Sequence, residues 1–145
     1  MLKANGVKIA PGNSVARDLV IKGEVNMGVT DTDDVNVALE DKQLVAMVLP
    51  DRDGMSAPLM PNMVSLIASA PRVEAGKKMI DYLLSAEVER ELGRSEGVQI
   101  PLHFGVEGPK NIPPVTFFKS LTLDYDNAAG RVEDVVKRLQ PTLGL

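Results

Sequence analysis

Apolar residues gather along the chain in short segments that predict β-strands. The segments Leu44–Leu49 and Met63–Ala68 are apolar almost throughout, which is typical of strands buried on both faces of a sheet. The segment Gly6–Ala10 alternates between apolar and polar residues, as an edge strand does, and Val25–Thr30 predicts a further short strand.

Between these segments, apolar residues recur three and four positions apart, which predicts amphipathic helices. Short polar residues stand where these helices begin, since their oxygens accept hydrogen bonds from the free amides of a first turn. Glycines stand where two of the helices end. The expected helices begin near Asn13 or Ser14, Asp33, Pro71, Ser85, and Asp124 or Asp126, and they end near Gly23, Leu39, Leu84, Gly93 and Leu139.

Predicted strands that alternate with predicted helices favour an α/β fold. The stretch 97–114 is rich in Gly and Pro and predicts an irregular connection before the last helix. We therefore expect an α/β segment over residues 1–60, followed over residues 61–145 by a return strand and a mostly helical segment.

Composition excludes several classes of protein. The hydrophobic fraction of 44% is that of a folded globular chain, and the net charge of −4 without a dense basic block argues against nucleic acid as a partner. The chain contains no cysteine, so disulfides, thiolate metal sites and cysteine nucleophiles are excluded. No apolar run reaches the ~18 residues of a membrane helix, and the first ten residues contain no apolar segment of a signal peptide.

Polar residues at the ends of the predicted strands and helices are the candidate ligand-binding residues. A helix that starts at Asn13 and Ser14 presents free amides that suit an oxyanion, although either residue also fits a simple N-cap. The candidates further along are Asp31, Thr32, Asp33 and Asp34. The carboxylates Asp33 and Asp34 are hard oxygen ligands for a metal ion, or acceptors for an amine or hydroxyl of an organic solute. They equally fit an acidic cluster at a helix start.

Two further interpretations concern catalysis. The pattern Asp31-x-Asp33-x-Val35 after an apolar segment is similar to the opening motif of Mg-dependent haloacid-dehalogenase-like phosphohydrolases, in which the first Asp is the nucleophile and the second the acid/base. His103 is the sole histidine and has no spaced ligand or nucleophile beside it, which favours a structural or solvated role.

Several longer motifs carry a resemblance that covers residues from about 2 to 139. They resemble the second lobe and C-terminal helices of the extracytoplasmic solute-binding proteins of ABC importers, and the ferric-iron-binding branch in particular. The matching motifs are Asn13–Val20, Gly23–Asp31, Leu59–Leu66, Ala70–Val88 and Gln99–Pro101.

The resemblance implies part of a type 2 periplasmic-binding-protein fold, with second-lobe strands and helices plus C-terminal helices and with the first lobe missing. It places Asn13 and Asp31 where the family has anion-contacting Asn residues. It places Asp33 and Asp34 where the iron binders have a Tyr pair, a departure that puts iron binding in doubt. The six candidates, Asn13, Ser14, Asp31, Thr32, Asp33 and Asp34, would then face the ligand cleft.

The function that this resemblance implies is non-catalytic. It is that of a solute-binding component of an importer, located in the periplasm or otherwise outside the cytoplasmic membrane, with an ABC permease as its partner. The ligand would be a metal ion or a small organic solute. A metal ion would be bound as the transported ligand, and no cofactor is expected. Helices that lack the first lobe beneath them would expose apolar faces, so we expect self-association. A truncated product without transport activity is the remaining alternative.

Overall fold

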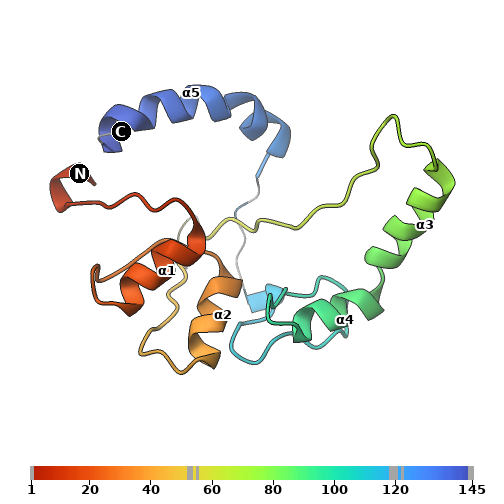
Figure 1. Ribbon diagram of the computed structural model, residues 1–145, viewed down its shortest axis with the longest axis horizontal. Helices are drawn as coiled ribbons and strands as arrows, with labels where there is room; N and C mark the ends of the chain where they lie inside the picture. The colour runs from red at the N-terminus through yellow and green to blue at the C-terminus, as the bar shows by residue number, and fades with distance from the viewer. Residues whose placement is uncertain (1, 52–53, 55, 118–120, 122, 144–145) are drawn as a thin grey trace.

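The structure is a computed structural model that describes residues 2–51, 54, 56–117, 121 and 123–143. These residues form helices joined by extended and irregular segments, as Figure 1 shows. They contain no β-strand, and the one ladder contact is an isolated parallel bridge between Pro58 and Leu121. The elements are η1 (Lys3–Asn5), α1 (Asn13–Ile21), α2 (Thr32–Glu40), α3 (Val73–Leu83), α4 (Ala86–Arg94), η2 (Val115–Phe117) and α5 (Tyr125–Leu143).

The prediction of an α/β, type 2 periplasmic-binding-protein fold is therefore wrong for this structure. The expected strands at 6–10, 25–30, 44–49 and 63–68 are not helical, but they pair with no neighbouring strand among the described residues. Many of their apolar side chains lie in solvent: Leu44 is 104% exposed and Met63 is 86% exposed. An apolar run signals a tendency to be buried, whereas a strand also needs a neighbour for its amide and carbonyl groups.

The predicted helices are confirmed, and two of their starts follow the expected chemistry. The Ser85 hydroxyl accepts a hydrogen bond from the Val88 amide at 3.4 Å at the start of α4. The Asp124 carboxylate accepts one from the Asn127 amide at 3.0 Å at the start of α5. Each acceptor satisfies an amide that has no partner inside the helix.

The predicted helix ends near Gly23, Leu39 and Leu84 are confirmed, and those at Gly93 and Leu139 are wrong. Gly23 follows α1 with a φ of 70°, the left-handed conformation that glycine adopts without a steric penalty. Gly93 does not end α4, because it is buried inside the helix against the carbonyl of Gln99. α5 continues through Pro141, since a proline in the last turn removes only one helical hydrogen bond.

Helices α1 and α2 pack against each other through the segment that joins them. This segment runs back along α1, and a Cβ at Gly28 would lie 3.2 Å from the carbonyl oxygen of Ala16. Near its end, the Thr30 hydroxyl donates a hydrogen bond to the carbonyl of Asn13 at 3.2 Å. The start of α2 is thereby held beside the start of α1.

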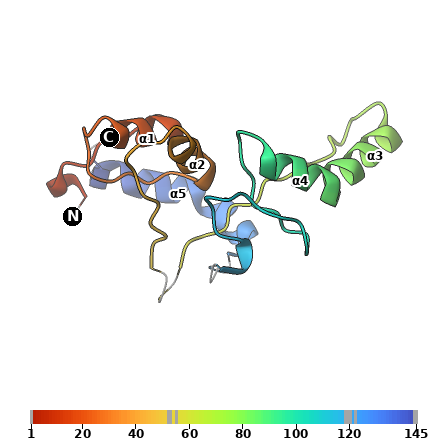
Figure 2. The same cartoon turned by 90° about the horizontal axis from the view of Figure 1, so that it is seen from below.

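A second packed unit joins α4 to the irregular stretch 97–114. Val98 and Ile112 are buried there. The side-chain amide of Asn111 donates a hydrogen bond, 3.2 Å long, to the side-chain oxygen of Asn36, a buried residue of α2. This contact connects the unit to α2, while α3 extends away from it at the far end of the molecule in Figures 1 and 2.

The chain exposes far more surface than a globular protein of its mass. Its accessible surface is 11435 Å² for 15.6 kDa, whereas a folded monomer of this size exposes about 7,300 Å². The excess of about 4,000 Å² agrees with the dispersed helices of Figure 2. No helix among the described residues is long and apolar enough to span a membrane.

The carboxylate of Glu89 anchors the irregular stretch to α4. It accepts hydrogen bonds at 2.9 Å from the backbone amides of Leu102 and His103, and it lies 2.8 Å from Nδ1 of His103. Partial burial raises the pKa of Glu89, but the hydrogen bonds from the His103 and Leu102 amides outweigh this effect and set the pKa below its ordinary value. The ionised form is therefore favoured in the folded chain.

Replacing Glu89 by glutamine should release this anchor. The loss of charge-assisted hydrogen bonds costs about 2 kcal/mol, which corresponds to a roughly 30-fold loss of hydrogen-exchange protection. The measurement is amide exchange at Leu102 and His103.

Because the folded-state pKa of Glu89 is depressed, the stabilisation of the fold by this carboxylate is present above the ordinary glutamate range and is lost as the pH falls through the folded-state pKa. Unchanged protection in Glu89→Gln would show that the anchor contributes nothing.

Candidate functional site

The starts of α1 and α2 meet and bring together the residues that the sequence singled out. We call these residues the polar tip: Asn13, Ser14, Asp31, Thr32, Asp33 and Asp34. The side-chain amide of Asn13 donates a hydrogen bond to the carboxylate of Asp31. Ser14 lies in the first turn of α1, and Thr32, Asp33 and Asp34 lie in the first turn of α2.

The N-cap interpretation of Asn13 or Ser14 is wrong. Gly12 occupies the N-cap position of α1, and no side chain caps that helix. Asp31 occupies the N-cap position of α2, yet its carboxylate is bound by Asn13 and makes no capping hydrogen bond. The tip side chains therefore contact each other across the two helix starts instead of closing their own helices.

Arg17 contacts the polar tip, although the sequence analysis did not single it out. Its guanidinium donates to Asp34 at 2.9 Å, and to Asp18 at 2.9 and 2.8 Å. The signal was present in the sequence, because Arg17 lies four residues after Asn13 and so on the same face of α1. The ion pair with Asp34 crosses from α1 to α2 and holds the two helix starts together.

The three aspartates of the tip influence each other's protonation. Partial burial raises the pKa of Asp33 and of Asp34, and the negative charge of Asp31 raises both further, while Arg17 opposes this effect at Asp34. Burial also acts to raise the pKa of Asp31, but the Asn13 amide and the neighbouring carboxyls of Asp33 and Asp34 lower it below its ordinary value. The tip therefore holds an excess of negative charge that a cation would stabilise.

The predicted metal ligands Asp33 and Asp34 lie in adjacent positions of α2. Across the described part of the chain, no group of three or more His, Cys, Asp or Glu residues is arranged to hold a metal ion. Two carboxylates alone do not complete the coordination that a hard cation needs. Metal binding by Asp33 and Asp34 stays a prediction.

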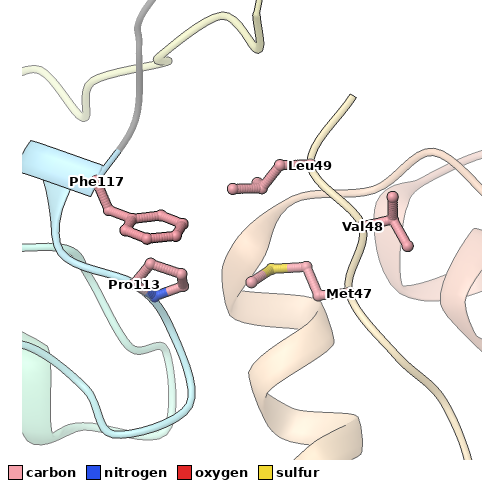
Figure 3. A pocket seen from close by; sticks show the side chains of 5 residues that line it. All are labelled: Met47, Val48, Leu49, Pro113 and Phe117. Carbon is pink, nitrogen blue, oxygen red and sulfur yellow. The ribbon is translucent and has the colours of Figure 1, made fainter. Parts of the chain in front are cut away.

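An apolar hollow lies away from the polar tip. It has a volume of about 330 Å³ and is lined by Met47, Val48, Leu49, Pro113 and Phe117. In Figure 3, Pro113 and Phe117 face Met47 and Leu49 across this hollow. Its lining carries no titratable group, so it offers an apolar contact surface and no acid–base chemistry.

His103 contacts the Glu89 carboxylate, with Nδ1 and Oε2 2.8 Å apart. The neighbouring backbone amides bind the same carboxylate. This arrangement positions the irregular stretch. The contacts agree with the structural role that the sequence predicts for His103.

Comparison of the chain with protein-family models, with curated proteins and with solved structures finds no match.

Proposed function

We propose that the chain is a solute-binding component of an ABC-type importer and that its polar tip contacts a cationic ligand. The observation that carries this proposal is the clustering of Asp31, Asp33 and Asp34 at the joined starts of α1 and α2, where their pKa values are mutually perturbed. The resemblance of the sequence motifs to extracytoplasmic solute-binding proteins supports it from a separate direction.

The charge balance at the tip favours a cation as the ligand. Within the described residues, Asp34 is the one tip carboxylate that pairs with a cationic side chain, Arg17. A unit charge held about 4 Å from a carboxylate gains up to about 4 kcal/mol in the partly screened environment of a protein surface. A metal ion or an amine would both supply that charge.

The tip by itself forms one wall of a binding site. Asn13 and Asp31 are exposed, and Asp33 is only half-buried, so a ligand held here keeps much of its contact with water. High affinity in a two-walled site comes from closure of a second surface over the ligand. We therefore expect the chain alone to bind its ligand weakly. The proposal also includes an importer permease as the partner of the chain and a location outside the cytoplasmic membrane.

Titration calorimetry with Mn²⁺ and, separately, with 1,4-diaminobutane tests this function. The chain should bind at least one of the two probes with a dissociation constant on the order of 1 mM. The double variant Asp33→Asn/Asp34→Asn should weaken this binding at least about tenfold, because a loss of 1.4 kcal/mol already has that effect.

The matched control is the double variant Asp81→Asn/Glu87→Gln, which removes the same two charges from exposed positions of α3 and α4 and should leave binding unchanged. Equal loss in the control and the tip variant would contradict a specific role of the tip. A second assay is the hydrolysis of p-nitrophenyl phosphate with Mg²⁺. If the parent chain hydrolyses this substrate and Asp31→Asn does not, the result contradicts the proposal and favours the phosphohydrolase alternative.

A further inference from the structure

The segment Leu44–Leu49 follows α2 as an extended chain, and its backbone makes almost no hydrogen bonds within the described residues. The amide of Val45 donates to the carbonyl of Gln43 at 2.9 Å. In the part of the chain that the structure describes, the other amides and carbonyls of the segment make no hydrogen bond. An extended segment with unpaired amides and carbonyls is a template on which another extended segment pairs.

The side chains of this segment alternate between two faces. The inner row, which is partly buried, consists of Val45, Met47 and Leu49, and the outer row, which is exposed, consists of Leu44, Ala46 and Val48. In Figure 3, Met47 and Leu49 point towards the apolar hollow, and Val48 points away from it. A period of two residues is that of a β-strand. The segment therefore has the side-chain geometry of a strand and lacks only a neighbour.

The order of residues in the segment is nearly the same in both directions, so the segment matches a second copy of itself. It reads Leu-Val-Ala-Met-Val-Leu from residue 44 to residue 49, and Leu-Val-Met-Ala-Val-Leu in reverse. In an antiparallel pair that places Leu44 opposite Leu49, leucine faces leucine, valine faces valine and alanine faces methionine. A small side chain opposite a large one fills the space between the strands. The segment contains no charge, proline or glycine, which is the composition of segments that stack on identical copies.

This register also covers the exposed side chains. Residues that lie opposite each other in an antiparallel pair point to the same face, and here each outer-row residue lies opposite an inner-row residue of the second copy. Leu44 and Ala46 of the second copy therefore lie beside Leu49 and Met47, on the face where these two line the hollow. The helices of the two copies lie on opposite faces of the pair and do not compete for space.

The same register makes the association open-ended. Successive residues of a strand direct their amides and carbonyls to alternate edges. Because outer-row residues bond with inner-row residues, the two copies pair through opposite edges of the segment. Each copy keeps one unpaired edge, to which a further copy adds by the same contact. A head-to-tail contact of this kind produces a growing assembly and not a closed dimer.

From these features we propose that copies of the chain associate by antiparallel pairing of their Leu44–Leu49 segments, with Leu44 opposite Leu49. The product is an intermolecular β-sheet to which further copies add. This association is independent of ligand binding at the polar tip, because none of the polar-tip residues belongs to the segment.

Sedimentation velocity and infrared spectroscopy of the full chain test the association. As the concentration rises, the mean mass should increase from the monomer mass of 15.6 kDa past that of a dimer. The amide I absorption of intermolecular β-sheet should increase with it. A chain that stays monomeric, a dimer that does not grow, or growth without the sheet absorption would overturn the proposal.

A charge in the outer row should prevent the pairing. Val48→Lys should raise the concentration at which assembly begins at least about 100-fold, because it places an ammonium group opposite the apolar Val45 of the next copy. The matched control Val136→Lys adds the same charge at an exposed position of α5 and should leave assembly unchanged. Equal weakening by both variants, or weakening by the control alone, would overturn the proposal. Circular dichroism of each variant establishes that the helices are retained.

Cross-linking tests the register, and it is simplified by the absence of natural cysteine. In the proposed pair, Ala46 lies opposite Met47 of the next copy. An equimolar mixture of Ala46→Cys and Met47→Cys, with oxidised glutathione as the oxidant, should therefore form the mixed disulfide beyond its statistical proportion. Mass spectrometry separates this product from the two homodimers, because the variants differ in mass. An excess of the Ala46→Cys homodimer, which in-register parallel strands would produce, would overturn the proposed pairing.

Discussion

Replacing Ile112 by alanine should destabilise the unit formed by α4 and the stretch 97–114 by about 3 kcal/mol. Ile112 is 4% exposed and Val98 is 3% exposed, and they are among the few apolar side chains that the described residues enclose. Truncation removes buried methyl groups and leaves a cavity, and so small a core has few neighbours that can close it. Hydrogen exchange of the Val98 and Gln99 amides measures the local opening free energy.

The matched control is the same substitution at an exposed position. Ile67 is 74% exposed, so Ile67→Ala should change the same opening free energy by less than about 0.5 kcal/mol. Equal effects of the two substitutions on the exchange of Val98 would mean that Ile112 does not belong to a packed core.

Replacing Arg17 by alanine should loosen α1 from α2 by about 2 kcal/mol. The Arg17–Asp34 pair is partly buried, with side chains 20% and 16% exposed. Without the guanidinium, Asp34 keeps its negative charge beside Asp31 and Asp33 with no cation to offset it. Hydrogen exchange in α2 measures the change.

The pH dependence of this loss has a defined sign. The pKa of Asp34 is raised by burial and by Asp31, so its ionised form is the one that destabilises the folded state, and protonation relieves the cost. The difference in stability between Arg17→Ala and the parent should therefore be largest at neutral pH and shrink as the pH falls through the carboxyl range.

The control is Arg94→Ala, which breaks an exposed pair with Glu91 at 3.7 Å and should cost less than about 0.5 kcal/mol. A loss of the same size at both sites, or one independent of pH, would contradict this role of Arg17.

The helices could be predicted from the sequence because their determinants are local. Ser85 and Asp124 each satisfy an amide three residues further along, and Gly23 adopts a left-handed conformation that needs no distant partner. Only the exact ends differed, as at Gly93 and Pro141, where packing and position in the last turn decide.

The strands could not be predicted in the same way because strand pairing is not local. The segment 44–49 has the composition of a buried strand, but its hydrogen bonds depend on a neighbour that its own residues do not specify. Among the described residues, that neighbour is absent, so Leu44 and Val48 stay exposed.

The sequence singled out the residues of the polar tip but did not predict all of the contacts that join them. The sequence placed Asn13 at a helix start and Asp31 between a predicted strand and the next helix, and the structure joins the two by a hydrogen bond. It did not predict that Arg17 would pair with Asp34 across the helices, because that contact depends on how α1 packs against α2. Our central claim is that these residues bind a cationic solute.

The most direct test of that claim is paramagnetic line broadening of backbone amide signals by Mn²⁺. Broadening falls off steeply with distance from the ion, so it locates even a weakly bound cation. We predict that the amides of Thr32, Asp33 and Asp34 broaden first and that Asp33→Asn/Asp34→Asn abolishes this effect. Broadening that begins instead at the acidic residues of α4 or α5, with the α2 start unaffected, would contradict the assignment of the polar tip as a ligand-binding surface.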